Sequence, residues 1–407
     1  MGFCYKKCKE AAKWEDMKVL LLDWNAYGGE DIKAVFTDMG YILEVCPFPD
    51  GIRTSQKQAD ELLLKILEEG SFDFVFSFNY IPVVSNCCLA CEVAYVSWVY
   101  DSPYIHVYSY TVLNPCNFIF LFDYAVYEEL RREGISTVYY LPLAVNEKRL
   151  GNLACTDAYK QKYQADVSFV GSLYDEPKHR IYDKFKNISP YVKGYLDAIV
   201  KAQKNIYGYN FLQGLLSEDI VKEMQKAYPT DPNAKTVMSP EAIYAEYVLA
   251  RQVTAMERRE ILEMLGKKAD VFQTVLYTNN PDTYITGIAN KGIVDYYDAM
   301  PYVFMNSKIN LNITLKSIKT GIPLRAFDIM GSGGFLLTNY QPEMAEYFVP
   351  DEDFVYYDSY DGLMEKVEYY LSHEKERIEI AQNGANKVRT EHTMKKRIEE
   401  MVKVLCS

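Results

Sequence analysis

The chain has 407 residues, a length that favours two or three domains and argues against a peptide or a lone binding module. Hydrophobic residues make up 49% and charged residues 25%, as in soluble globular proteins, which disfavours a disordered or collagen-like chain. The formal net charge of −12 disfavours broad contact with nucleic acid or anionic lipid, because both need clustered Lys and Arg. We therefore expect no nucleic-acid partner.

Several features bear on location and metal binding. Polar residues interrupt the apolar stretches at 83–100 and 118–127, so neither is long enough to span a membrane, and residues 1–14 lack the apolar core of a secretory signal. We expect a cytoplasmic protein without stable membrane anchoring, whose nine cysteines are reduced. The cysteines and four histidines lack the paired spacing of zinc ligands, so no metal site is expected.

The first part of the chain alternates between strands and helices. The apolar run at 18–23 is too continuous for an exposed antiparallel strand and predicts a buried parallel one. Turn residues bound the later apolar runs, which predict strands at 42–48, 72–78, 94–100, 117–122 and 137–143. Between them, helical patterns predict one helix that ends at Met39 and two more at 55–69 and 124–133. After an N-terminal extension at 1–16, we expect a doubly wound α/β domain at 17–160.

A second series of strands begins at Asp166 and predicts another domain of the same class, at 161–385. The expected strands lie at 167–173, 271–277, 309–313, 335–338 and 354–357. Residues from about 180 to 266 interrupt this alternation of strands and helices. Their residues recur at helical spacing, which predicts a helical insertion. We expect the last segment, 386–407, to be a helix that packs back on the first domain. Two Rossmann-like domains would then face a cleft, with ligands beyond the carboxyl ends of the strands.

The sharpest motif lies at 321–334. Pro323 stands where a helix is predicted to start, since its missing N–H is not needed there. The N-terminus of that helix, open toward Gly321, offers unpaired N–H groups and partial positive charge to a diphosphate. Arg325 and Asp328 share one helical face, where a guanidinium can bind phosphate and a carboxylate can bind a ribose diol. The alternative is a surface ion pair between these two side chains.

Segments on both sides of the insertion resemble glycosyltransferases related to the CgeB spore-maturation proteins. They lie at 95–103, 140–144, 169–174, 308–317, 321–340 and 342–348, and the resemblance spans most of the chain outside 1–16 and the insertion. It implies a GT-B fold in which the second domain holds a nucleotide-sugar donor and the first receives the acceptor, usually without a metal.

The resemblance also implies roles for single residues. Asp328 falls on the second of two carboxylates eight residues apart, which related retaining enzymes use to hold the ribose. The first falls on Thr320, so the donor sugar and the anomeric outcome stay open. Tyr296 lies in a segment similar to the loop that packs around the nucleobase. Lys308 and Asn310 are expected to reach the diphosphate, with a solvated loop or a strand-end hydrogen bond as the alternative for each.

Further candidates follow other strands. Asp101 directly follows a predicted strand and precedes Ser102–Pro103. Desolvation there would raise its pKa and suit it to deprotonate an acceptor hydroxyl. The alternative is a cap on the Ser-Pro turn. In the second domain, Gly171 permits close backbone approach to the donor, and Ser172 belongs to the same turn. Asp101 and Arg325 are the expected catalytic residues, with Arg325 stabilising the charge of the leaving diphosphate.

These observations predict a metal-independent glycosyltransferase without a cofactor, which moves a hexosyl unit from a nucleotide diphosphate sugar, a UDP-sugar being favoured, to a protein or glycan acceptor. The expected donor contacts are Gly171, Ser172, Tyr296, Lys308, Asn310, Gly321, Arg325 and Asp328. Two alternatives stay open. Thr320 in place of a carboxylate favours a non-catalytic nucleotide-sugar-binding protein, and a UDP-sugar epimerase shares the architecture.

Overall fold

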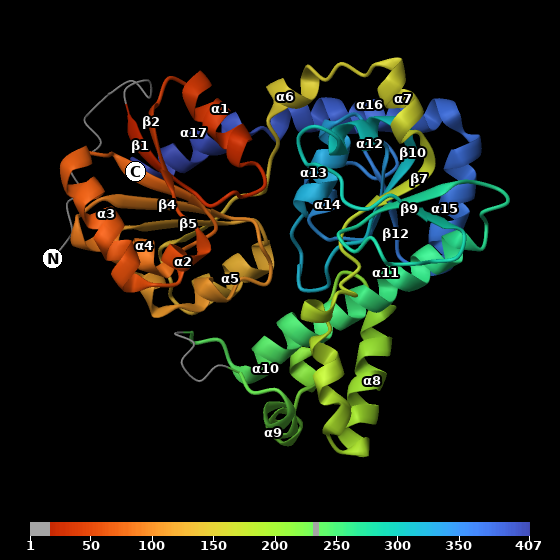
Figure 1. Cartoon of the computed structure of the whole chain (residues 1–407), viewed down its shortest axis with the longest axis horizontal. Coiled ribbons are helices and arrows are strands. Elements are labelled where there is room, and N and C mark those ends of the chain that lie inside the picture. The colour runs from red at the N-terminus through yellow and green to blue at the C-terminus, as the bar shows by residue number, and fades with distance from the viewer. Residues whose placement is uncertain (1–16, 231–235) are drawn as a thin grey trace. The chain divides into compact units, whose positions relative to one another are not determined.

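A computed structural model describes residues 17–230 and 236–407, so the predicted extension at 1–16 and part of the predicted insertion lie outside the described residues. The described chain divides into two compact units (Figure 1). The first comprises residues 17–149, 236–237 and 390–407, and the second comprises 150–230 and 238–389. The chain first passes from one to the other within the short helix α6, Glu147–Gly151.

The first unit contains a parallel six-stranded sheet in the order β2-β1-β3-β4-β5-β6. Its strands are β1 Lys18–Asp23, β2 Ile42–Pro47, β3 Phe74–Phe78, β4 Ala94–Val99, β5 Asn117–Leu121 and β6 Val138–Tyr140. Its helices are α1 Gly29–Asp38, α2 Asp50–Arg53, α3 Gln56–Gly70, α4 Pro82–Ala90, η2 Ile105–Tyr108, η3 Tyr110–Leu113, α5 Tyr124–Arg132 and α17 Met394–Leu405. The central strands β3 and β4 are buried along their whole length, which explains their unbroken apolar sequence.

The last helix of the chain belongs to this first unit. Thr393 forms a β-bridge with Val145, and the N–H of Met394 donates to the carbonyl of Val145 at 2.8 Å. Arg397 on α17 donates from Nε to the carbonyl of Pro142 at 2.9 Å, and α17 packs against α1. The C-terminal segment therefore returns to a sheet formed by the beginning of the chain.

The second unit contains another parallel six-stranded sheet, in the order β12-β11-β10-β7-β8-β9. Its strands are β7 Ala165–Val170, β8 Thr274–Tyr277, β9 Ile288–Asn290, β10 Ser307–Asn312, β11 Leu336–Asn339 and β12 Val355–Tyr357. Its sheet is accompanied by α7 Asp157–Tyr163, α12 Met300–Asn306, α13 Leu324–Gly331, α14 Met344–Tyr347, α15 Tyr360–Ser372 and α16 Glu374–Glu391. The sheets of both units confirm the predicted α/β class.

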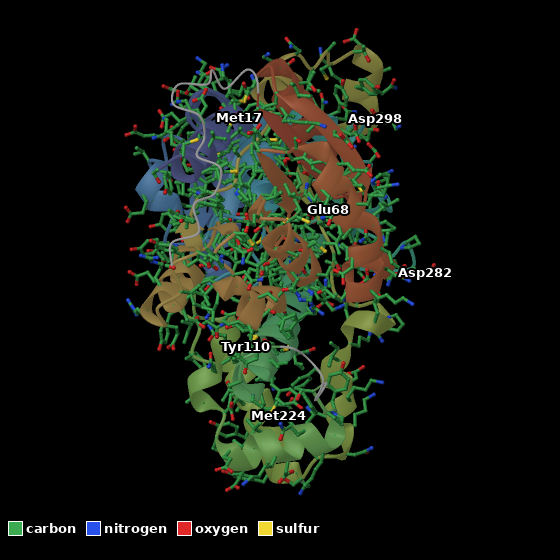
Figure 2. All side chains as sticks on the ribbon, turned by 90° about the vertical axis from the view of Figure 1, so that its left-hand side faces the viewer. Met17, Glu68, Tyr110, Met224, Asp282 and Asp298 are labelled. Carbon is green, nitrogen blue, oxygen red and sulfur yellow. The ribbon has the colours of Figure 1, made fainter. Side chains whose placement is uncertain are left out.

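The long connection between β7 and β8 is helical and forms a hydrophobic core of its own. It contains η4 Pro177–His179, η5 Ile181–Asn187, α8 Pro190–Lys204, η6 Gln213–Leu215, α9 Glu218–Ala227, α10 Pro240–Ile243, η7 Tyr244–Leu249 and α11 Ala250–Gly266. Figure 2 shows all described side chains from another side and labels Met224, a fully buried residue of α9. Helix α11 begins in this separate core, and its C-terminal half packs against the core of the second sheet through Ile261, Leu262 and Leu265.

Several elements were missing from the expectations, among them strand β9 and helix α4. The three-residue strand β9 is only partly buried, so it lacks the apolar run that marks the other strands. Helix α4 begins at Pro82 and buries Val83, Val84, Cys87 and Cys88. Its largely apolar sequence hides the helical period, and both of its cysteines belong to the hydrophobic core.

Candidate functional site

The sheet of the second unit reverses its winding between β7 and β10. These strands are neighbours, with Asn310 opposite Ser168. From β7 the chain moves outward to β8 and β9, whereas from β10 it moves the other way to β11 and β12. The loops that follow the two strands therefore part from each other at the carboxyl edge. Ligands of open α/β sheets bind at such a switch point, so these loops define the candidate site.

Arg258 from α11 connects the two loops at the switch point. Its Nη1 donates to the carbonyl of Ser172 at 2.6 Å, and its Nε donates to the carbonyl of Ile313 at 3.1 Å. The guanidinium also lies over the rings of Phe169 and Tyr174, and its burial lowers the pKa of the group. Arg258 thus fixes the spacing of both loops. Sequence reasoning missed it, because nothing in a helical segment signals contacts with residues 55 and 86 positions away.

Gly171 and Ser172 lie in the loop after β7, as expected. The N–H of Gly171 donates to the carbonyl of Tyr277 at 2.9 Å, and a Cβ atom there would approach the Phe169 ring to 3.2 Å. The Ser172 hydroxyl accepts from the N–H of Tyr174 at 2.9 Å, so it helps to close its own turn. These contacts shape the loop and leave the donor-binding role of both residues a prediction.

Tyr296, Arg325 and Asp328 form one cluster at α13. The Tyr296 hydroxyl donates to Oδ1 of Asp328 at 2.9 Å, and Nη1 of Arg325 lies 3.5 Å from Oδ2 of the same carboxylate. Tyr296 and Asp328 are buried, whereas the Arg325 side chain keeps 26% of its surface exposed and also contacts Met300 and the Phe304 ring. The structure therefore brings together three predicted site residues from two separate segments, α13 and the segment that contains Tyr296. The partly exposed guanidinium of Arg325 can still bind an anion.

Gly321 precedes α13 at the same end of the sheet. Pro323 is the N-cap residue of α13, and no side chain of the described residues caps this terminus. The first N–H groups of a helix have no partner within the helix, so they can donate to a ligand or to water. The arrangement fits the expected open N-terminus beside Gly321.

Lys308 and Asn310 lie elsewhere than a donor diphosphate would require. Lys308 is at the amino end of β10, where its Nζ pairs with Oδ1 of Asp166 at 2.7 Å. Asn310 is buried within β10, where its amide donates to the Phe304 carbonyl at 3.0 Å and accepts from Ser168 at 2.9 Å. Asn310 therefore makes hydrogen bonds within the sheet, close to the strand-end alternative, whereas Lys308 forms an exposed ion pair on β10 instead of lying in a solvated loop.

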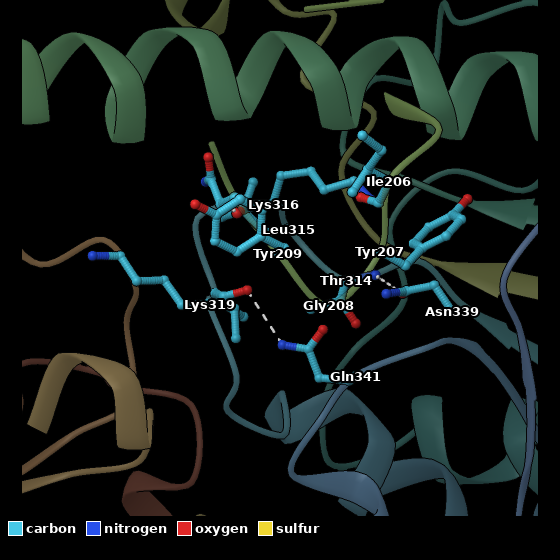
Figure 3. Close-up of a pocket in the computed structure, with 12 residues that line it drawn as sticks. Ile206, Tyr207, Gly208, Tyr209, Thr314, Leu315, Lys316, Lys319, Asn339 and Gln341 are labelled. Carbon is cyan, nitrogen blue, oxygen red and sulfur yellow. Dashed lines mark hydrogen bonds between the residues drawn. The ribbon is translucent and has the colours of Figure 1, made fainter. Parts of the chain in front are cut away.

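A pocket with an empty volume of about 290 Å³ opens beside the ends of β10 and β11 (Figure 3). The connection between β7 and β8 supplies one wall through residues 206–210, and the loop after β10 supplies another through Lys316 and Lys319. Two side-chain amides that line the pocket form hydrogen bonds with the backbone. Gln341 donates to the Ile318 carbonyl at 3.2 Å, and Asn339 accepts from the Thr314 N–H at 2.7 Å. The pocket therefore has basic and aromatic walls that are held in place by their own hydrogen bonds.

A buried ion pair supports this pocket from α11. Glu257 is fully buried, and its Oε2 lies 3.6 Å from Nζ of Lys316. Its Oε1 accepts from the Tyr207 hydroxyl at 2.7 Å, and the Lys316 ammonium lies 3.9 Å from the centre of the Tyr207 ring. Burial raises the pKa of Glu257 and lowers the pKa of Lys316. Thr254, one turn earlier, accepts from the Lys316 N–H at 2.9 Å, so α11 holds this loop through several side chains.

In the first unit, Asp101 follows β4 at the carboxyl edge. Its Oδ2 accepts from the Asn79 amide at 2.7 Å, while Oδ1 of Asn79 accepts the N–H of Tyr100 at 3.0 Å. Asp101 keeps exposed surface, yet crowding by the protein desolvates its carboxyl group and raises its pKa, which the hydrogen bond from Asn79 partly offsets. The other strand-end carboxylates are engaged locally, since Asp23 pairs with Lys33 and Asp123 caps α5. Asp101 is thus well suited to exchange a proton with a ligand.

Two searches of the described residues were negative. No group of three or more His, Cys, Asp and Glu side chains within 17–230 and 236–407 is arranged to hold a metal ion. Over the same residues, no helix combines the length and the apolar character that crossing a membrane requires.

Comparison with known proteins places these features in context. A family model described as glycosyl transferase-like matches residues 251–403, which include α11 and the Arg325–Asp328 motif. No curated protein sequence matches the chain. The structure of sucrose-phosphate synthase from Thermosynechococcus elongatus is similar, with a TM-score of 0.55 and 8% identity over 96% of this chain and 99% of that one.

Two further structures have comparable similarity. HepE from Anabaena, in complex with UDP and glucose, has a TM-score of 0.50 and 11% identity over 96% of this chain and all of its own. A UDP-forming α,α-trehalose-phosphate synthase from Burkholderia xenovorans has a TM-score of 0.51 and 11% identity with the same coverage. At such low identity these likenesses establish the fold, which is the GT-B type found in glycosyltransferases.

Proposed function

We propose that this protein is a glycosyltransferase that moves a hexosyl unit from a nucleotide diphosphate sugar, with a UDP-sugar favoured, to a protein or glycan acceptor. The cluster of Tyr296, Arg325 and Asp328 carries this proposal, because it joins a cation and a buried carboxylate at the carboxyl edge of the second sheet. The GT-B fold and the glycosyl transferase-like match over 251–403 support it. A narrower relationship to CgeB-like proteins rests on the sequence motifs alone.

In this proposal the second unit binds the donor. Asp328, positioned by the hydrogen bond from Tyr296, accepts hydrogen bonds from the hydroxyl groups of the ribose. Arg325 contacts the diphosphate, which gains negative charge as the glycosidic bond breaks. Lys308 has no part in donor binding, since its ammonium is paired at the opposite edge of the sheet. The positive charge that the leaving group needs therefore comes mainly from Arg325 and the open terminus of α13.

The first unit supplies the acceptor side of the reaction. Asp101, with its raised pKa, takes the proton of the acceptor hydroxyl as the new glycosidic bond forms, and Asn79 orients its carboxylate. This assignment corresponds to an inverting transfer. We also propose that the reaction needs neither a metal nor a cofactor, since Arg325 can stabilise the diphosphate charge. The cytoplasmic location stays a prediction.

The test measures the thermal stability of the protein with UDP, GDP, dTDP and CMP, each with and without EDTA. A ligand that binds only the folded state raises the unfolding temperature, so we expect a shift with UDP that EDTA does not change. The matching UDP-hexoses are then incubated with glycan and protein acceptors, and transfer is followed by mass spectrometry. Absence of a shift with every nucleotide would refute the proposal. Binding without transfer would favour a non-catalytic protein, and sugar isomerisation without an acceptor would favour an epimerase.

A further inference from the structure

Arg53 lies at the carboxyl edge of the first sheet, where it stacks on Trp24. Arg53 ends helix α2, which follows β2, and Trp24 follows β1. The guanidinium carbon of Arg53 lies 4.4 Å from the centre of the Trp24 ring. Nε1 of Trp24 donates to the Phe78 carbonyl at 2.9 Å, and the indole also stacks on Tyr100, so its position is fixed. A guanidinium held flat on a fixed ring is well suited to bind a carboxylate or phosphate group with its N–H edge.

The ion pair that Arg53 makes within the protein is a weak one. Its Nη2 contacts Oδ1 of Asp50, one turn earlier on the same short helix, and the Asp50 side chain is 85% exposed. Such a pair contributes little, because water screens it. The guanidinium makes no other hydrogen bond or ion pair within residues 17–230 and 236–407. An anionic ligand can therefore bind its remaining N–H groups or replace Asp50 at little cost.

Asp101 and His106 both lie within the electrostatic range of Arg53. Desolvation raises the pKa of Asp101, while the Asn79 amide and the charge of Arg53 both act against this rise. Desolvation lowers the pKa of His106, and the charge of Arg53 lowers it further. Arg53 and Asp101 nevertheless form no direct ion pair in the part of the chain that the structure describes. The cation and the carboxylate thus lie near each other without being in contact.

Asp101 and His106 both have surface for a ligand. Oδ2 of Asp101 accepts from Asn79, whereas Oδ1 accepts no hydrogen bond from any residue that the structure describes. His106 is exposed, and its uncharged imidazole offers one N–H donor at neutral pH. Its ring meets that of Tyr104 edge-on at 5.2 Å. This edge therefore offers a cation, a neutral donor and a carboxylate oxygen, which together can bind an acidic group and a hydroxyl of one molecule.

We propose that the acceptor is an acidic saccharide, whose phosphate or carboxylate group binds to Arg53 and His106 while one of its hydroxyl groups contacts Asp101. The hydroxyl oxygen forms the new bond to the transferred sugar, the bond from that sugar to the diphosphate breaks, and Asp101 takes the proton. Arg53 selects charged over neutral acceptors. The proposal rests on the proposed function, because it assigns this edge to the acceptor, and it narrows the class of acceptor to acidic saccharides.

The experiment uses saccharides that differ only at C6, namely glucose, glucose 6-phosphate and glucuronate. Titration calorimetry should show that at least one acidic saccharide binds the wild-type protein about 10-fold or more tightly than glucose, and the two acidic ligands distinguish phosphate from carboxylate. Arg53→Gln should weaken binding of that ligand by about 10- to 100-fold, because charge-assisted hydrogen bonds are lost, and leave glucose within about twofold. The matched control is Arg132→Gln, since Arg132 is an exposed arginine of α5 that also pairs within its own helix, with Glu128.

Several outcomes would overturn the proposal. It fails if glucose binds as tightly as both acidic saccharides, if none of the three binds, or if Arg53→Gln binds the acidic ligand like the wild type or the Arg132→Gln control. Arg53→Lys keeps the charge, so it must bind the acidic ligand more tightly than Arg53→Gln, whereas an equal loss in both variants would indicate a purely structural role. These titrations contain no nucleotide, so their failure is distinct from an absence of UDP binding, which would refute the proposed function itself.

Discussion

Replacing Lys316 by Met would test the buried ion pair beneath the pocket of the second unit. Glu257 is fully buried, and the Lys316 side chain is 8% exposed, so water screens their interaction little. At 3.6 Å and an effective dielectric constant of about 20, the attraction between the two charges is about 5 kcal/mol. Most of this gain offsets the cost of burying both charges. Lys316→Met removes the gain while Glu257 stays buried.

We therefore expect Lys316→Met to lower the free energy of unfolding by about 3–5 kcal/mol at neutral pH. The double variant Lys316→Met/Glu257→Gln should recover most of this loss, because the amide is neutral and still accepts from the Tyr207 hydroxyl. The loss should also shrink on acidification. Without Lys316 the folded-state pKa of Glu257 rises further above its unfolded value near 4.5, so the folded state binds the extra proton and gains stability as pH falls.

The assay is urea unfolding followed by circular dichroism at pH 7 and pH 5, with Lys375→Met as the control. Lys375 is an exposed lysine of α16, so its replacement should change the free energy of unfolding by no more than about 0.5 kcal/mol. The reasoning would be refuted if Lys316→Met were no more destabilising than this control. It would equally fail if the double variant were less stable than the single one.

Further predictions concern turnover and ligand affinity. Arg325→Ala should lower kcat by at least about 100-fold while the unfolding temperature changes little, because the half-exposed guanidinium serves the leaving diphosphate; steady-state kinetics and calorimetry check both. Activity should fall with decreasing pH, with a midpoint above the pKa of an ordinary Asp, because the pKa of Asp101 is raised. Asn79→Ala should move this midpoint to still higher pH, because the variant loses a hydrogen bond that lowers the pKa of Asp101. Tyr296→Phe should weaken UDP binding about 3- to 10-fold, since Asp328 loses the donor that orients it; unchanged affinity in titration calorimetry would contradict this.

The sequence alone predicted the alternation of strands and helices well. Central strands such as β3 and β4 are buried on both faces, so their sequences are continuously apolar and easily recognised. The short strand β9 carries no such run, and its pairing with β8 depends on the neighbouring strand rather than on its own residues. Local patterns therefore determined which segments form the sheets, except where a segment is too short or too polar to carry a pattern.

The contacts of the candidate site residues were also only partly predictable from the sequence. Arg325 and Asp328 could be paired from the sequence because helical spacing fixes neighbours three residues apart. The strand predicted at 309–313 contains Asn310, and Lys308 directly precedes it. Only the parallel register, however, directs Lys308 to Asp166 and buries Asn310 against Ser168.

Contacts between distant segments were decided by the tertiary structure alone. Arg258 reaches the loops after β7 and β10 because α11 crosses the switch point, and Glu343 meets Thr320 because β10 and β11 are adjacent parallel strands whose loops emerge at one edge. Such contacts leave no trace in sequence spacing, since they depend on strand order, which is a property of the whole sheet. The sequence thus determined the type of fold and one motif, and packing of the sheet decided which residues surround it.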